Sequence, residues 1–148
     1  MMEPAGDALI QEDHELIELS FPAHPDLVVL ARFAAATVAA RAGFDVEEIE
    51  DLRLAVDELF VSLGPMTRNA CVRIELDRRG DTVSIVSSFE GVTARSAMER
   101  AMGQQDETWE KAAELSELLL DSLVDEHGRE TRSGGPVAWL SKRRSFAQ

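Results

Sequence analysis

The chain has 148 residues and a formal net charge of −13, with 28 Asp and Glu against 15 Lys and Arg. Such a charge argues against direct nucleic-acid binding and against an anionic membrane surface, because both depend on Lys and Arg to neutralise phosphate. The sequence has a single cysteine, Cys71, no apolar run of about 20 residues and no basic N-terminal leader, so a cytoplasmic protein that does not enter the membrane is expected.

The first part of the chain is predicted to contain a flexible segment, a strand and a helix. Residues 1–13 are polar and predicted to be flexible, and residues 14–144 are predicted to form a single domain. In residues 14–22, HELIELSFP, apolar side chains partly alternate with polar ones, which is typical of a strand. Pro25 at the start and Gly43 at the end then delimit an alanine-rich, well-buried helix.

A second helix is predicted in DVEEIEDLRLAVDELFVSLGP, residues 45–65. Asp45 is suited to the N-cap, and Glu48 three residues later completes a capping box. Gly64 and Pro65 end the helix. The residues at helical spacing that are expected to face the core are Ile49, Leu52, Val56, Leu59, Phe60 and Leu63.

The second half is predicted to contain two hairpins and a long helix. Alternating residues on both sides of Gly80 indicate a hairpin within residues 69–91, NACVRIELDRRGDTVSIVSSFEG, and residues 92–107 indicate a loop or short helix. A second hairpin is predicted from strands at residues 126–131 and 137–142. The helix between the hairpins is expected to bury one face, formed by Trp109, Ala112, Leu115, Leu119 and Leu123. This order of elements predicts an α+β fold, a mixed or antiparallel sheet with helices on one face.

Common catalytic and metal-binding patterns are not found in the sequence. His14, His24 and His127 are isolated, and Cys71 is interpreted as a small core residue of a strand. No nucleophile elbow and no phosphate-binding loop of the P-loop or dinucleotide type is present. Glu58, in the middle of the second helix, is by its spacing alone a solvated carboxylate.

The motif DLRLAVDELFVSL and the order of elements resemble the N-box helix and fold of the anti-sigma-factor serine/threonine kinases. These kinases belong to the GHKL class of histidine-kinase-like ATPase domains, and their helix reads roughly L-A-V-x-E-A-x-x-N-A. The resemblance extends from about His14 to Arg144. It implies a GHKL (Bergerat) two-layer sandwich and a site for ATP and Mg.

Residue by residue, the resemblance implies an altered nucleotide site. Glu58 matches the proposed general base, whereas Ser62 stands where the family has its metal-binding Asn. The family's D-x-G-x-G segment corresponds to SSFEGVT, which offers Ser88 and Gly91 as candidate cofactor-binding residues but no Asp. The last long helix begins TWEKAAELSELLL, without the glycines that cradle phosphate at a helix start. We therefore expect weak or no binding of ATP and Mg.

Three functions follow from these expectations. The first is a regulator that binds a protein partner, which by resemblance is a sigma factor or an anti-sigma-factor antagonist. Arg32, Arg41 and Arg53 are candidate contacts, although the preferred interpretation is that they are solvated helix charges. The second is an active ATP-dependent serine/threonine kinase, in which Glu58 is the base and Asp51 or Asp57 assists the metal. The third is a dimerisation subunit, and a homodimer is compatible with the first function.

Overall fold

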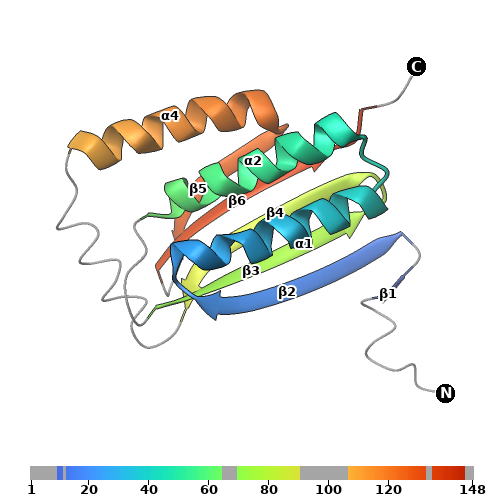
Figure 1. The fold of residues 1–148 in the computed structure, drawn as a ribbon, viewed down its shortest axis with the longest axis horizontal. Coiled ribbons are helices and arrows are strands. Elements are labelled where there is room, and N and C mark those ends of the chain that lie inside the picture. Colours follow the sequence, from blue (N-terminus) through green and yellow to red (C-terminus); the bar gives the residue numbers. More distant parts are fainter. Residues whose placement is uncertain (1–9, 12, 65–69, 91–106, 133–134, 146–148) are drawn as a thin grey trace.

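The computed structural model describes residues 10–11, 13–64, 70–90, 107–132 and 135–145 (Figure 1). Its described strands form one antiparallel sheet in the order β1-β2-β3-β4-β6-β5. The elements are β1 Ile10–Gln11, β2 His14–Pro22, α1 Val28–Arg41, α2 Val46–Leu63, β3 Cys71–Arg79, β4 Thr82–Glu90, α4 Glu107–Leu123, β5 Glu126–Arg132 and β6 Gly135–Arg143. The helices lie together over one face of the sheet, which confirms the predicted α+β two-layer sandwich.

Parts of the sequence predictions fall outside the described residues. Residues 1–9 and 92–106 are not among them, so the flexible N-terminus and the loop or short helix stay predictions, as do the domain limits 14–144. The two-residue strand β1 lies within the segment that was expected to be flexible and pairs with the start of β2. None of the described helices is long and apolar enough to cross a membrane.

The first two helices begin and end as their sequences predict. A short 3-10 helix, Pro25–Leu27, leads into α1, and the His24 side chain accepts a hydrogen bond from the backbone N–H of Asp26. The predicted capping box at the start of α2 is confirmed, since the side chains of Asp45 and Glu48 each accept from the other residue's backbone N–H. Gly64, with a φ of 117°, ends α2.

The core lies between the sheet and the helices, because alternate strand residues face the helix layer. β3 contributes Val72, Ile74 and Leu76, and β4 contributes Val83 and Ile85, all fully buried. The predicted stripe of α2 covers them, with Leu52, Val56 and Leu59 fully buried and Ile49 packed at the margin. Both predicted hairpins are present, β3–β4 and β5–β6.

Two predictions about side-chain burial are wrong. Cys71 is exposed at the first position of β3, because the inward register of that strand begins at Val72. The long helix α4 does not bury Leu115 and Leu119, which are exposed. Its buried face instead consists of Ala113, Ser116, Leu120 and, just after the helix, Val124. The several leucines of this helix fit more than one stripe, and the small Ala113 and Ser116 let α4 approach its neighbours closely.

The C-terminal end of the described chain is tied to the start of α2. Glu48 is only 8% exposed, and its second carboxylate oxygen accepts a 2.7 Å hydrogen bond from the backbone N–H of Ser145. The adjacent Gly43 has a φ of 83°, and a Cβ there would lie 2.6 Å from the guanidinium of Arg144. The positive φ favours a glycine here, whereas the flexible Arg144 side chain could shift to make room for a Cβ. The chain after β6 is thus fixed to the α1–α2 connection.

Candidate functional site

Glu58 lies on the side of α2 that faces α4. Its carboxylate is half-buried and accepts a 2.6 Å hydrogen bond from the hydroxyl of Ser116, a residue of α4 that is only 2% exposed. The two helices run antiparallel and pack along their lengths (Figure 1). Glu58 is therefore not the freely solvated carboxylate that its spacing indicates, since a neighbouring helix holds it by a short charge-assisted hydrogen bond.

Ser62 follows Glu58 by one turn and is 5% exposed. Its hydroxyl oxygen is buried and has no hydrogen-bond partner among the described residues. A magnesium ion keeps several water molecules and needs open access to its protein ligands. The buried hydroxyl of Ser62 does not fit this requirement, and no group of three His, Cys, Asp or Glu side chains that could hold a metal occurs in the described part of the chain.

Replacing Ser62 by alanine is expected to raise the free energy of unfolding by about 1 kcal/mol, because a buried hydroxyl without a partner is destabilising. The matched control is Ser87→Ala. Ser87 is fully buried too, but its hydroxyl donates to the carbonyl of Ala138 at 3.1 Å, so its loss is expected to destabilise by about the same amount. Chemical denaturation of both variants measures the two effects, and a loss of stability in both would contradict the unpartnered state of Ser62.

Two arginines near this site are paired with carboxylates of the chain. Arg32 of α1 lies 3.3 Å from the Asp57 carboxylate of α2, and Arg53 hydrogen-bonds Glu50 at 2.8 Å. Burial raises the pKa of the Asp57 carboxyl above its ordinary value; the charge of Arg32 opposes this shift and that of Glu58 adds to it. Asp57 is thus directed at α1, on the opposite side of α2 from Ser62 and α4.

Arg41, the third arginine considered as a partner contact, belongs to a different cluster. It donates to Glu15 of β2 at 2.7 Å, and the buried Arg78 of β3 donates to the same carboxylate at 2.7 Å. The hydrogen bonds from Arg41 and Arg78 hold the pKa of Glu15 below its ordinary value. A contact between Arg41 and a partner stays a prediction, as it does for Arg32 and Arg53.

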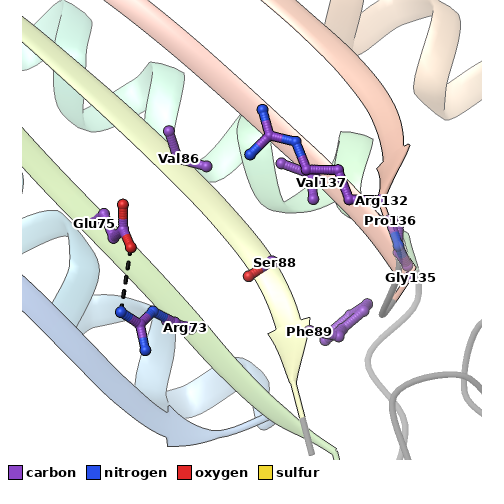
Figure 2. Close-up of a pocket in the computed structure, with 9 residues that line it drawn as sticks. All are labelled: Arg73, Glu75, Val86, Ser88, Phe89, Arg132, Gly135, Pro136 and Val137. Atoms are coloured by element: carbon purple, nitrogen blue, oxygen red, sulfur yellow. Dashed lines mark hydrogen bonds and ion pairs between the residues drawn. The ribbon is translucent and has the colours of Figure 1, made fainter.

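Ser88 lies apart from Glu58. Backbone pairing sets it opposite Arg73 and Val137, on the face of the sheet that carries no helix. There it lines a hollow of about 250 Å³ together with residues of β3, β4 and the β5–β6 hairpin (Figure 2). The structure therefore does not bring Ser88 together with Glu58 and Ser62. Gly91 lies outside the described residues.

Two histidines of the described structure pair with carboxylates. His14 contacts Asp77 at 2.7 Å, and His127 contacts Asp121 at 2.6 Å. Each pair joins neighbouring elements, β2 to β3 and α4 to β5. These contacts are structural ties at the surface of the sheet.

Ser116 is the site residue that the sequence analysis missed. It interrupts the buried face of α4 with a hydroxyl, between Ala113 and Leu120. A polar residue within an apolar helical stripe signals a hydrogen-bond partner on a neighbouring element, because buried polar groups are rarely left unpaired. The leucines of α4 obscure this signal in the sequence, because a stripe through Leu115 and Leu119 leaves Ser116 outside the buried face.

Comparison with known families agrees with this architecture. The model of the histidine kinase-like ATPase domain matches residues 21–142, most of the chain. The chain belongs to this family. The matched region contains both Glu58 and Ser62, and it confirms the GHKL class that the N-box resemblance predicted.

Curated relatives are bacterial serine-protein kinases named RsbW. The protein of Bacillus subtilis strain 168 is 28% identical over 142 residues, which cover 87% of this chain and 86% of that kinase. The protein of Listeria monocytogenes serotype 4a is 49% identical over 45 residues, 30% of this chain and 29% of that kinase. The protein of Bacillus pumilus is 45% identical over 49 residues, 33% and 30% of the two chains. The Listeria and B. pumilus matches thus span less than a third of those relatives.

Proposed function

We propose that this member of the histidine kinase-like ATPase family is a bacterial cytoplasmic regulator that acts by binding a protein partner. The partner is a sigma factor or an anti-sigma-factor antagonist, and ATP and Mg bind weakly or not at all. The similarity to proteins named serine-protein kinase RsbW supports a role in the same kind of regulation. The net charge of −13 supports a protein partner over nucleic acid.

One observation carries the proposal of a weakened nucleotide site. In the family that the N-box resembles, the base and the metal ligand lie one turn apart and face the triphosphate. In this chain the carboxylate of Glu58 accepts a hydrogen bond from Ser116 of α4, and Ser62 presents a buried hydroxyl. Glu58 is thus engaged by a neighbouring helix, and the Ser62 hydroxyl beside it is too buried to bind a metal ion. Without a metal-bound triphosphate, Glu58 has little to activate as a general base.

The alternative function is an active ATP-dependent serine/threonine kinase. It is favoured by the names of the relatives and by the presence of Glu58 at the position of the general base. In this function Glu58 must exchange its contact with Ser116 for the hydroxyl of the substrate serine, since a base acts within hydrogen-bond reach of the proton it removes.

The two functions are separated by mixing the purified chain with sigma factors and anti-sigma-factor antagonists of its host, with and without Mg-ATP. We expect a complex on size exclusion that does not depend on nucleotide, and no transfer of radiolabelled phosphate. Transfer to an antagonist that is lost in Glu58→Gln would establish the kinase. Light scattering of the same samples tests the homodimer that we also propose, and a monomer at high concentration would exclude it.

A further inference from the structure

The outer surface of the helix layer carries large apolar side chains. Among the described residues, the exposed apolar side chains include Leu54 and Val61 of α2 and Leu115, Leu118 and Leu119 of α4. The exposed fraction is 54% for Leu54 and 57% for Leu115. The leucines of α4 lie at i, i+3 and i+4, so they are neighbours on the helix surface. Contiguous exposed apolar surface on a soluble protein commonly marks a binding site.

The hydrogen bond between Glu58 and Ser116 fixes the positions of the apolar side chains of α2 relative to those of α4. On α2, Leu54 and Val61 lie one turn before and one turn after Glu58. On α4, Leu115 is adjacent to Ser116 and Leu119 lies about one turn after it. The two helices are antiparallel and packed together (Figure 1). From this arrangement we infer that the two apolar strips run side by side. We call this surface, formed by Leu54, Val61, Leu115, Leu118 and Leu119 around Glu58, the α2/α4 seam.

The charges around the α2/α4 seam are mostly negative. Glu47 and Asp51 lie on the outward side of α2, and Glu110 and Glu114 are exposed on α4. None of these four carboxylates is in an ion pair of the described structure, and Lys111 is the only Lys or Arg in the sequence of α4. This surface attracts a cationic ligand and repels an acidic one.

Glu58 adds a position-specific preference for a cation. Its carboxylate is half-buried within the seam and is hydrogen-bonded to a neutral hydroxyl, and no Lys, Arg or His of the described residues forms an ion pair with it. A carboxylate in such surroundings gains from an opposite charge that arrives with a partner, because its charge is only partly solvated.

We propose that the α2/α4 seam binds an amphipathic helix of a protein partner, with an apolar stripe that covers the leucines and flanking Lys or Arg that pair with Glu58 and its neighbours. Helices of this kind are recognised by apolar grooves between helices. A second copy of this chain fits poorly, because it would bring two negative surfaces together. The inference rests on the proposed function in one respect, the existence of a protein partner, and it defines where and by which chemistry that partner binds.

The test uses three synthetic peptides of about 18 residues, or five helical turns, and the full-length chain. The first carries a leucine stripe flanked by lysines, the second has the same stripe flanked by glutamates, and the third has the lysines with serine in place of leucine. Fluorescence anisotropy is expected to give a micromolar Kd for the Leu/Lys peptide and at least about tenfold weaker binding for the other two. Equal binding of the Leu/Lys and Ser/Lys peptides would overturn the proposal, because charge alone would then explain it.

Variants of the chain locate the binding surface. The double variant Leu115→Ser/Leu119→Ser is expected to weaken the Leu/Lys peptide at least about tenfold, and Glu58→Gln severalfold. The matched control is Leu30→Ser/Phe33→Ser, which removes two exposed apolar side chains of α1 and should leave the Kd unchanged. Equal losses in the seam and α1 variants would contradict a specific site. Circular dichroism melts confirm that the variants fold.

Three further outcomes decide what occupies the seam and whether the proposed function stands. If light scattering shows a dimer that the Leu115→Ser/Leu119→Ser variant dissociates, a second copy occupies the seam and the proposal fails. If the chain forms a complex with a sigma factor or antagonist that the seam variant leaves intact, the proposal fails while the proposed function stands. If it forms no such complex, the proposed function fails on its own, whatever the peptides show.

Discussion

Replacing Glu48 by alanine is expected to lower the free energy of unfolding by about 3 kcal/mol, the largest effect predicted for this chain. The carboxylate is buried and accepts hydrogen bonds from the backbone N–H groups of Asp45 at 3.1 Å and of Ser145 at 2.7 Å. Its loss leaves both donors without this acceptor and releases the chain after β6 from the start of α2. Chemical denaturation measures the change, and the exposed neighbour Glu47→Ala is the control, with an expected change below about 1 kcal/mol.

The same carboxylate makes stability depend on pH. Burial alone raises the pKa of Glu48, but the N–H groups of Ser145 and Asp45, together with the Ser145 hydroxyl and the charge of Lys142, outweigh burial. The pKa therefore lies below the ordinary value of 4.5. A carboxyl whose pKa is lower in the folded state stabilises the protein fully above the unfolded value and loses this contribution as pH falls through the folded pKa. Glu15, held by Arg41 and Arg78, acts in the same direction.

Stability of the wild type is therefore expected to be constant near neutral pH and to fall below about pH 4.5. In Glu48→Gln, part of this acid dependence should disappear, because the group no longer titrates. Unfolding curves at a series of pH values compare the two slopes. Identical slopes below pH 4.5 would show that Glu48 does not contribute to the dependence.

Ser116→Ala is expected to lower the free energy of unfolding by about 1–2 kcal/mol, the second largest effect. The variant removes the hydroxyl that donates to Glu58 at 2.6 Å and leaves a half-buried carboxylate facing an apolar helix. Ser122→Ala is the control on the same helix. Its exposed hydroxyl bonds the carbonyl of Leu119 within α4, so its removal should change stability by less than about 0.5 kcal/mol.

A double-mutant cycle shows whether the loss comes from the pair. If Ser116 acts through Glu58, the effect of Ser116→Ala should shrink in the background of Glu58→Ala, with a coupling of about 1 kcal/mol. Additive effects of the two substitutions would instead mean that the hydrogen bond contributes nothing to holding α4 on α2.

Local features of the fold could be predicted because their causes are local. The capping box of α2 joins Asp45 to Glu48, three residues away, and Gly64 ends the helix by its own backbone conformation. The β3–β4 hairpin follows from alternating residues around a glycine turn at Gly80. Helical spacing alone did not predict the buried face of α4, because leucines occupy adjacent stripes of this helix. Only the packing against α2 determines that Leu120 is buried and Leu119 is exposed.

The candidate site was predicted only in part, because its key contacts join distant parts of the sequence. Glu58 was identified from the N-box resemblance, but its partner Ser116 lies 58 positions further along the chain. The bond from Ser145 to Glu48 spans 97 positions. No periodicity or motif encodes such contacts; they depend on the tertiary packing of α2 against α4 and of the C-terminal segment against α2.

We propose above that the histidine kinase-like ATPase fold serves protein binding in this chain and that its nucleotide site is weakened. Isothermal titration of the 148-residue chain with Mg-ATP is the most direct test of the weakened nucleotide site. We expect no saturable heat up to about 1 mM nucleotide. A one-to-one isotherm with a micromolar Kd that is lost in Ser62→Ala would contradict the claim, because it would make Ser62 a working ligand for Mg-ATP.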